Sequence, residues 1–192
     1  MRNRKTSLYI AYGSNLNVRQ MKTRCPEAEP FLRRKFALND SQLVFRGYAD
    51  VIYSPGHQAP AGLWRITKSD ERALDLYEGV DSGLYSKEPV VLSDGSDALI
   101  YVMNDDGVAP PNRFYLDTIR VGYDNFKLDP AYLDEAVDRS WDGKEHSELT
   151  KMRYDNWRQD PQPARKLLAH LTQDVALRKI KRAHAKLKRK TA

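Results

Sequence analysis

The sequence contains a single cysteine, Cys25, among 192 residues, so no disulfide can form within the chain. Its four histidines are scattered and, with one cysteine, they show none of the ligand spacings of a zinc site. No apolar run approaches the roughly 20 residues that a membrane-spanning helix needs. The apolar stretch at residues 8–11 is also too short for the core of a signal peptide. These absences predict a cytoplasmic protein with no metal site and no membrane span.

Glycine is scarce as well, with ten residues, and no glycine-rich run matches a P-loop or a dinucleotide-binding fingerprint. Basic residues are in excess only near the C-terminus. Residues 178–192 hold eight lysines and arginines and no acid; since the whole chain carries a charge of +6, residues 1–177 carry −2. The basic character therefore belongs to the tail. The chain is 41% hydrophobic, which is enough for a buried core.

Strand-like segments dominate the first hundred residues and helix-like segments follow them, a pattern that predicts an α+β protein. Four local predictions follow from turn and capping residues. We expect a loop at residues 54–57, which read Ser-Pro-Gly-His. We also expect one helix capped by Asn17, a second over residues 69–78 that ends at Gly79, and a third over residues 112–121.

The composition becomes polar and proline-bearing after Trp141. This change predicts a boundary that divides the chain in two. We expect a domain over residues 1–140 and, over residues 141–192, a polar linker with a basic helical extension. The segment Arg178 to Lys190 has the charge to bind nucleic acid or another anionic partner, or an anionic membrane surface. A solvated basic helix without a partner accounts for the same residues.

Residues 9–21, YIAYGSNLNVRQM, predict a strand that ends in a tight turn before a helix. Such a turn presents backbone N–H groups, and Gly13 lacks a Cβ that would keep a ligand away from the main chain. The helix N-terminus adds partial positive charge. The stretch is therefore a candidate site for a carboxylate or a phosphate, although an ordinary turn capped by Asn15 or Asn17 explains it too.

Glu78 stands at the end of a predicted helix, where the macrodipole disfavours negative charge. Asp75 lies one turn before it and Asp81 three residues after it. Such surroundings would raise the pKa of the Glu78 carboxyl toward the value that a general base uses near neutral pH. A solvated glutamate at a helix end is the alternative. Among the eleven tyrosines, one or two are candidates to line a pocket.

Taken in order, these elements resemble the gamma-glutamylcyclotransferase family, including its AIG2-like branch. The resemblance covers about residues 7–138. Its opening motif and its catalytic glutamate motif match residues 12–16 and 78–80, and further matching elements follow along the chain. These matches are Tyr12-Gly13-Ser14-Asn15-Leu16, Glu78-Gly79-Val80, Ser82-Gly83-Leu84-Tyr85, Tyr101-Val102-Met103, and Tyr115 seven residues before Gly122.

The resemblance implies a small mixed, barrel-like sheet flanked by helices, with a pocket at its mouth. It also implies a reaction in which a γ-glutamyl compound cyclises to 5-oxoproline and releases an amine or an amino acid, with no metal or cofactor. Glu78 would be the catalytic acid and base. The substrate-binding residues implied are Tyr12, Gly13, Ser14, Asn15, Leu16, Tyr101 and Tyr115.

The motif Tyr-Gly-Ser-Asn-Leu differs from the Tyr-Gly-Ser-Leu typical of the glutathione-specific branch, and it leaves open whether the substrate is a γ-glutamyl amino acid or a γ-glutamyl amine. Another γ-glutamyl amide, on a modified amine or a protein side chain, is a third possibility. A different class of function also stays open: a binding module that holds a small carboxylate without turnover and is tethered by its basic tail. The carboxylate at Glu78 favours the enzyme, because a binding module has little need of it.

Overall fold

The computed structural model describes residues 5–33, 36–105 and 107–141. The predicted extension over residues 141–192 lies outside them, apart from Trp141, and so does its basic segment. The strands are β1 (Thr6–Ala11), β2 (Glu29–Pro30), β3 (Phe36–Phe45), β4 (Ala49–Thr67), β5 (Tyr85–Val91) and β6 (Asp97–Met103). The helices are α1 (Val18–Arg24), α2 (Lys68–Tyr77), α3 (Arg113–Phe126) and α4 (Pro130–Arg139), with short 3₁₀ turns η1 (Ser14–Leu16) and η2 (Val80–Ser82).

Strand β1 lies near the middle of a mixed sheet with the order β2-β4-β1-β6-β5, and β3 pairs with β4 beside this path. It runs antiparallel to β4, with Ile10 opposite Leu63, and parallel to β6, with Ile10 opposite Ile100. The carboxyl end of β1 is therefore flanked by β4 and by β6. The turn that follows β1 starts at this point.

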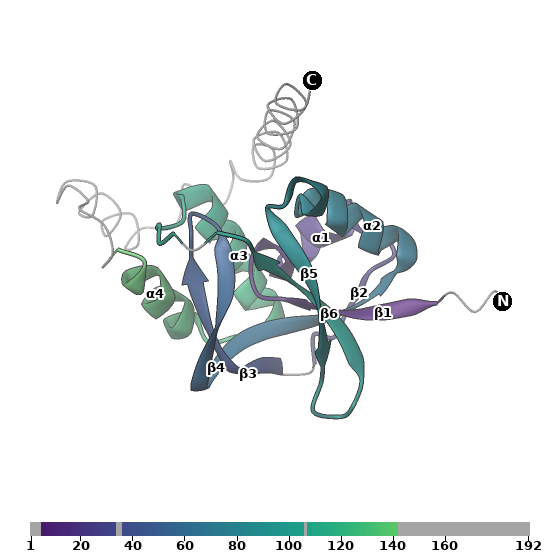
Figure 1. The fold of residues 1–192 in the computed structure, drawn as a ribbon, viewed down its shortest axis with the longest axis horizontal. Helices are drawn as coiled ribbons and strands as arrows, with labels where there is room; N and C mark the ends of the chain where they lie inside the picture. Colours follow the sequence, from purple (N-terminus) through teal and green to yellow (C-terminus); the bar gives the residue numbers. More distant parts are fainter. Residues whose placement is uncertain (1–4, 34–35, 106, 142–192) are drawn as a thin grey trace, which may run out of the picture.

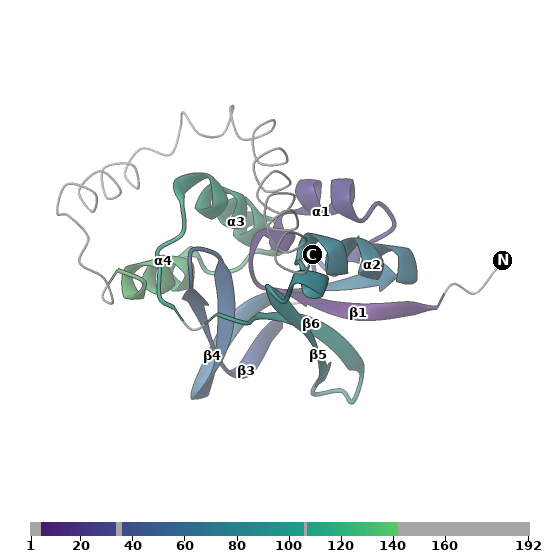
Figure 2. The ribbon, with the colours of Figure 1, turned by 45° about the horizontal axis from the view of Figure 1, so that its top comes forward.

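The helices pack on the curled sheet in separate groups. Figure 2 shows α1, α2 and α3 above the sheet and α4 beside the β3–β4 hairpin. Helices α1 and α2 contact each other, α2 also contacts β4, and α4 packs on β3 (Figure 1). Among the described residues, no helix has the length and apolar character needed to cross a membrane. The predicted α+β class is confirmed.

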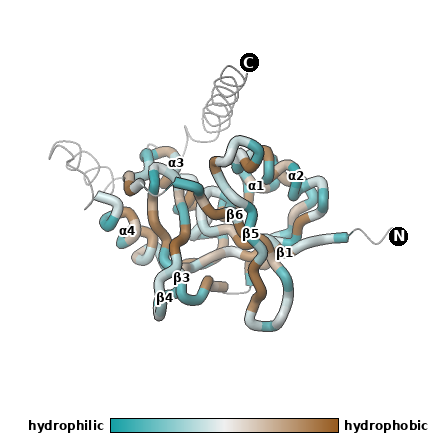
Figure 3. Tube along the Cα trace, viewed as in Figure 1, coloured by the Kyte–Doolittle hydropathy of each residue, from teal (hydrophilic) through white to brown (hydrophobic). Residues whose placement is uncertain are grey.

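Buried hydrophobic residues of the strands and of the helices form one core cluster, and Figure 3 shows hydrophobic segments in both kinds of element. The end of β1 is fully enclosed, and Trp64 of β4 packs edge-on against Phe126 of α3 with ring centroids 5.7 Å apart. Cys25 is buried as well. A core of this kind holds the carboxyl end of β1 in a fixed place, because the close-packed interior leaves it little room to shift.

The loop predicted at residues 54–57 is wrong, since these residues belong to β4. The register between β3 and β4 shifts between Asn39 and Ser41, where Asp40 adopts a φ of 48°. The Asp40 carboxylate accepts a hydrogen bond of 2.8 Å from the N–H of Gly56, which has a φ of 79°. An irregularity of this type lets a strand bend and carry a proline and a glycine without ending.

Two helix boundaries also differ from the predictions. Helix α2 starts one residue before Ser69 because Thr67 is its N-cap and forms a capping box with Asp70. Helix α3 continues beyond residue 121 to Phe126. Its buried face extends through Tyr123 and Phe126, so packing carries the helix past Gly122, a residue that weakens an isolated helix.

Gly122 is the point where α3 touches the turn after β1. A Cβ on Gly122 would lie 2.4 Å from the Cβ of Leu16, 2.7 Å from its carbonyl carbon and 2.9 Å from the amide nitrogen of Asn17. Two of these three atoms are backbone and cannot swing away. The absence of a side chain at Gly122 therefore allows α3 to seat η1 directly against its backbone.

Replacing Gly122 with alanine tests this contact, because the two relevant effects have opposite signs. Alanine favours a helix by about 1 kcal/mol over glycine, whereas overpacking costs about 1–3 kcal/mol. The clash with backbone atoms places the cost at the upper end of that range, so we expect Gly122→Ala to lower the free energy of unfolding by about 2 kcal/mol in urea titrations. Val121→Ala, on the exposed face of the same helix, should change it by less than about 0.5 kcal/mol. A Gly122→Ala protein as stable as the parent would contradict the steric interpretation.

Candidate functional site

A tight turn follows β1 and brings the Tyr-Gly-Ser-Asn-Leu motif together. The N–H of Leu16 donates to the carbonyl of Gly13 at 3.0 Å, and the N–H of Asn17 donates to Ser14 at the same distance. The predicted N-cap of α1 is confirmed, because the Asn17 side chain accepts the N–H of Gln20 at 3.1 Å. The turn is thus a single 3₁₀ unit joined to a capped helix.

A cavity of about 290 Å³, including its open mouth, lies beside this turn. Residues from β1, the turn, β4, β5, β6, α3 and the end of α2 line it. The lining residues are Tyr9, Tyr12, Gly13, Ser14, Asn15, Ala49, Glu78, Tyr85, Tyr101 and Tyr115. Of the site residues predicted from the sequence, Leu16 alone is not among them.

The Leu16 side chain lies instead in the core, with no exposed surface, under Gly62 and Gly122. Its N–H is already bonded to the Gly13 carbonyl. Leu16 does not line the cavity because its side chain is apolar and the 3₁₀ turn directs it toward α3. We therefore assign Leu16 a role in seating the turn and not in contacting a ligand.

Gly13 is needed for a close approach. A Cβ at this position would lie 3.0 Å from the Cβ of Ala49 and 3.0 Å from the hydroxyl of Tyr115. Any side chain would therefore press on the cavity wall. The glycine keeps the main chain of the turn at the cavity surface.

Glu78 follows the last residue of α2, and its N–H donates to the carbonyl of Leu74 at 2.8 Å. Gly79 then takes a φ of 65°, the left-handed conformation that ends helices. This geometry turns the chain away and leaves the Glu78 carboxyl in the cavity, where Oε1 accepts a 2.6 Å hydrogen bond from Nδ2 of Asn15. Two motifs 63 residues apart in the sequence thus meet through one bond.

Burial raises the pKa of the Glu78 carboxyl from 4.5 to about 7, while Arg24 and the Asn15 hydrogen bond act in the opposite direction. The sequence correctly predicted that the pKa of Glu78 is raised, but the predicted cause, the helix dipole and the neighbouring acids, is not the main one. The charge of Asp75 is compensated, since its carboxylate pairs with Lys87 at 2.9 Å and accepts a hydrogen bond from the Tyr101 hydroxyl at 2.7 Å. Desolvation of the carboxylate is the dominant cause instead.

Tyr9 and Arg24 lie behind the carboxyl and were not predicted from the sequence as site residues. Asn15 Nδ2 also donates to the hydroxyl of Tyr9 at 2.7 Å, and its Oδ1 accepts from the guanidinium of Arg24. Arg24 stacks on the ring of Tyr77, 3.3 Å from the centroid. In the sequence alone, Tyr9 reads as an ordinary core tyrosine and Arg24 as an ordinary cation in the last turn of a helix.

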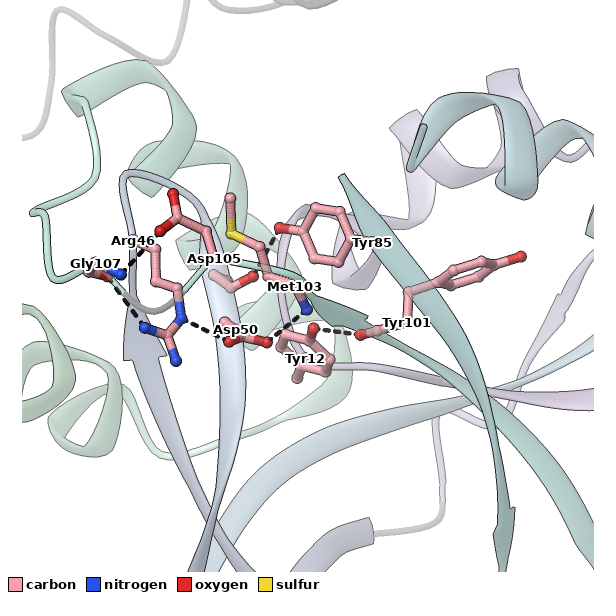
Figure 4. Close-up of polar contacts among 9 residues, drawn as sticks. Tyr12, Arg46, Asp50, Tyr85, Tyr101, Met103, Asp105 and Gly107 are labelled. Atoms are coloured by element: carbon pink, nitrogen blue, oxygen red, sulfur yellow. Dashed lines mark hydrogen bonds and ion pairs between the residues drawn. The ribbon is translucent and has the colours of Figure 1, made fainter. Parts of the chain in front are cut away.

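Phenol groups form much of the remaining wall. The Tyr12 hydroxyl donates to the carbonyl of Tyr101, and the Tyr85 hydroxyl donates to the carbonyl of Ala49 at 2.9 Å (Figure 4). The N–H of Ala49 in turn donates to the Tyr115 hydroxyl at 3.1 Å. Burial raises the pKa of each of these four tyrosines, so their hydroxyls are neutral near pH 7. The wall is polar but uncharged.

A buried ion pair fixes Ala49 relative to β6. Asp50 accepts from Nε of Arg46 at 2.8 Å and from the N–H of Met103 at 2.9 Å (Figure 4). Arg46 also donates to the carbonyl of Gly107 at 3.2 Å. These contacts tie the start of β4 to the end of β6, and the main-chain N–H and C=O of Ala49 bond two tyrosine hydroxyls.

The described residues contain no group of three or more histidine, cysteine or acidic side chains placed to hold a metal ion. The site that they do form is the cavity around Glu78. It combines one carboxyl of raised pKa, a main-chain turn and a ring of neutral hydroxyls.

The pKa of Glu78 makes a prediction for stability. A carboxyl with a higher pKa in the folded state than in the unfolded state costs stability as the pH rises from about 4.5 to about 7. Gln cannot ionise, so we expect Glu78→Gln to be more stable than the parent at pH 8, by about 1–3 kcal/mol, and similar to it at pH 4.5. Urea titrations at both pH values measure the difference. A variant that is less stable than the parent at pH 8 would contradict the assigned burial.

Known proteins are similar to this chain in sequence. The family model for gamma-glutamyl cyclotransferase, AIG2-like, matches residues 9–119. Human gamma-glutamylcyclotransferase is 33% identical over 129 residues, which cover 60% of this chain and 69% of the human protein. The mouse gamma-glutamylcyclotransferase is 31% identical over 147 residues, covering 68% of this chain and 77% of the mouse protein.

The fold gives the same result. A solved structure of a gamma-glutamyl cyclotransferase superposes with a TM-score of 0.60 at 28% sequence identity, covering 69% of this chain and 86% of that chain. The family match spans both the turn after β1 and the Glu78 motif, which are the two elements that meet in the cavity. The chain therefore belongs to the gamma-glutamyl cyclotransferase, AIG2-like family of enzymes.

Proposed function

We propose that this enzyme converts a γ-glutamyl amino acid or a γ-glutamyl amine to 5-oxoproline and releases the amino acid or amine. The family supports a cyclotransferase-like activity. The observation that carries the proposal is the Glu78 carboxyl, whose pKa of about 7 suits a group that gains and loses a proton near neutral pH. It faces a cavity bordered by main chain and neutral hydroxyls.

The chemistry begins with the α-amino nitrogen of the substrate. Glu78 takes a proton from this nitrogen, which attacks the γ-carbonyl carbon of the same molecule and closes a five-membered ring. The bond from that carbon to the leaving nitrogen then breaks, and Glu78 returns the proton to the leaving amine. Because the attack is intramolecular, the protein mainly has to hold the substrate in a folded, near-attack conformation. The overall reaction consumes no oxidant, reductant or second substrate.

The turn after β1 is the proposed seat of the substrate's anionic end. The N–H groups of Leu16 and Asn17 donate hydrogen bonds within the turn. The N–H of Ser14 donates to the Tyr115 hydroxyl. We assign the ligand contacts to the main chain at Gly13 and Asn15, at the cavity surface. Tyr12, Tyr101 and Tyr115 would position the substrate through their hydroxyls and rings, since neutral phenols can bond without competing for its proton.

A carboxylate-binding module without turnover is the second candidate, and it fits these observations less well. The relatives that match are named as cyclotransferases, and Glu78 stands in the cavity with a raised pKa. A module that only holds a carboxylate has no need of a second carboxyl in the same cavity. The site is better suited to transferring a proton than to binding alone.

The test is a product assay on the parent and on Glu78→Gln, with a panel of γ-glutamyl amino acids, γ-glutamyl amines and glutathione. We expect the parent to form 5-oxoproline, detected by mass spectrometry, and Glu78→Gln to lose about 10²–10⁴-fold in rate because it cannot carry the proton. The best substrate in the panel identifies the leaving group.

Asp81→Asn is the matched control, since Asp81 is an exposed carboxylate three residues away and is not part of the cavity lining. It should keep the parent rate. If the parent binds a γ-glutamyl compound but neither protein forms 5-oxoproline, the cyclotransferase proposal fails and the binding module replaces it. Equal rates for the parent and Glu78→Gln would retain the activity but remove Glu78 from it.

A further inference from the structure

Arg24 has no place in the proposed chemistry, yet it is joined to the catalytic carboxyl by a short chain of contacts. It is the last residue of α1, which packs beside α2 (Figure 1). Its guanidinium stacks on Tyr77, the residue before Glu78, and donates to Oδ1 of Asn15. Asn15 then reaches Glu78 through Nδ2, at 2.6 Å.

The two ends of the Asn15 amide are chemically different, and Arg24 distinguishes between them. A guanidinium can only donate hydrogen bonds, so the amide end that faces Arg24 must be the oxygen. The amide nitrogen then faces the opposite side, where its two hydrogens go to Glu78 and to the hydroxyl of Tyr9. With the amide reversed, an oxygen would face the carboxylate and no hydrogen bond could form between them.

We propose that Arg24 is a positioning residue for the general base: it fixes the Asn15 amide so that its nitrogen holds the Glu78 carboxylate in the cavity. This inference rests on the proposed function, in which Glu78 moves the proton. Arg24 does not itself line the cavity. The planar guanidinium suits this role, because stacking on Tyr77 fixes its plane while its edge donates to the amide.

The Cys25 thiol and five phenols around Glu78 carry no charge near pH 7, and Asp50, which acts on Tyr12 and Tyr85, is paired with Arg46. Burial raises the pKa of the Cys25 thiol to about 12 and raises those of the neighbouring phenols. The phenols whose pKa responds to the Glu78 charge are Tyr9, Tyr12, Tyr85, Tyr101 and Tyr115.

Beyond Tyr101, the Asp75 and Glu71 carboxylates are paired with Lys87. Among the described residues, Arg24 is the charged group that lowers the pKa of the Glu78 carboxyl, opposing its burial. Loss of Arg24 should therefore raise that pKa further and leave more of the base protonated at pH 6–7.

The experiment measures the carboxyl directly. The protein is labelled with ¹³C at glutamate carboxyls, and the Glu78 signal is assigned by its absence in Glu78→Gln. We expect the pKa of this signal to rise by about one unit in Arg24→Met, where a flexible side chain still covers Tyr77 but carries no charge. Arg65→Met is the matched control, since Arg65 also stacks on a ring, that of Phe31, and pairs with Glu29, and neither of these partners lines the cavity. It should leave the pKa unchanged.

Kinetics give the second readout. The acidic limb of kcat/KM for 5-oxoproline formation should move to higher pH in Arg24→Met by the same amount, about tenfold in rate at pH 6, with partial recovery at pH 9. Arg24→Lys, which keeps the charge but lacks the planar fork, should restore part of the loss. A purely structural residue would lower the rate equally at all pH values and would not move the limb.

An unchanged Glu78 pKa in a folded Arg24→Met protein, with its thermal midpoint near that of the parent, would overturn the inference. Should Arg24→Met not fold, Arg24→Gln gives the same test with a polar uncharged side chain. The two proposals fail separately. A parent that forms no 5-oxoproline ends the proposed function, whereas the carboxyl titration still decides whether Arg24 acts on Glu78.

Discussion

The seating of the turn after β1 against the bare backbone of Gly122 is the constraint on which the site depends. Leu16 fills the space that a side chain at Gly122 would occupy, and the turn is thereby held between α3 and the sheet. Residues 13–15 are left facing the other way, toward the cavity. The position of Asn15, and through it the hydrogen bond to Glu78, follows from a contact that no ligand would touch. Packing at the rear of the turn sets the geometry at its front.

The same arrangement explains why folding stability and the proposed proton transfer place opposite demands on Glu78. A carboxyl removed from water costs folding free energy once it ionises, and a carboxyl left in water would keep a pKa too low for a base near pH 7. The protein opposes burial with one hydrogen bond and one cation, both supplied by elements that precede the sheet's long strand β4. The neutral tyrosines add polarity without adding charge. The pKa of about 7 is therefore a balance between burial and these two contacts.

Local patterns made much of the fold predictable, whereas the site needed contacts between distant segments. The Asn17 cap and the Gly79 stop are visible in a few residues each, and the structure has both. Pro55 and Gly56 led to the wrong prediction of a loop, because an irregularity opposite Asp40 lets the long strand β4 contain both residues. The family resemblance indicated Glu78 and the turn. Arg24 was not predicted, because a cation in the last turn of a helix is ordinary in sequence and its partner Asn15 is set by tertiary packing.

The cause of the Glu78 shift shows where reasoning from one helix ends. A macrodipole contributes about 0.3–1 kcal/mol at a helix end, and 1.36 kcal/mol corresponds to one unit of pKa. The dipole alone would therefore move the carboxyl by less than one unit, which is too little to bring it from 4.5 to about 7. Burial can move a carboxyl by several units. Because burial here depends on β1, β5, β6 and α3 closing around the end of α2, the raised pKa of the proposed base is a property of the whole fold and not of the helix that carries it.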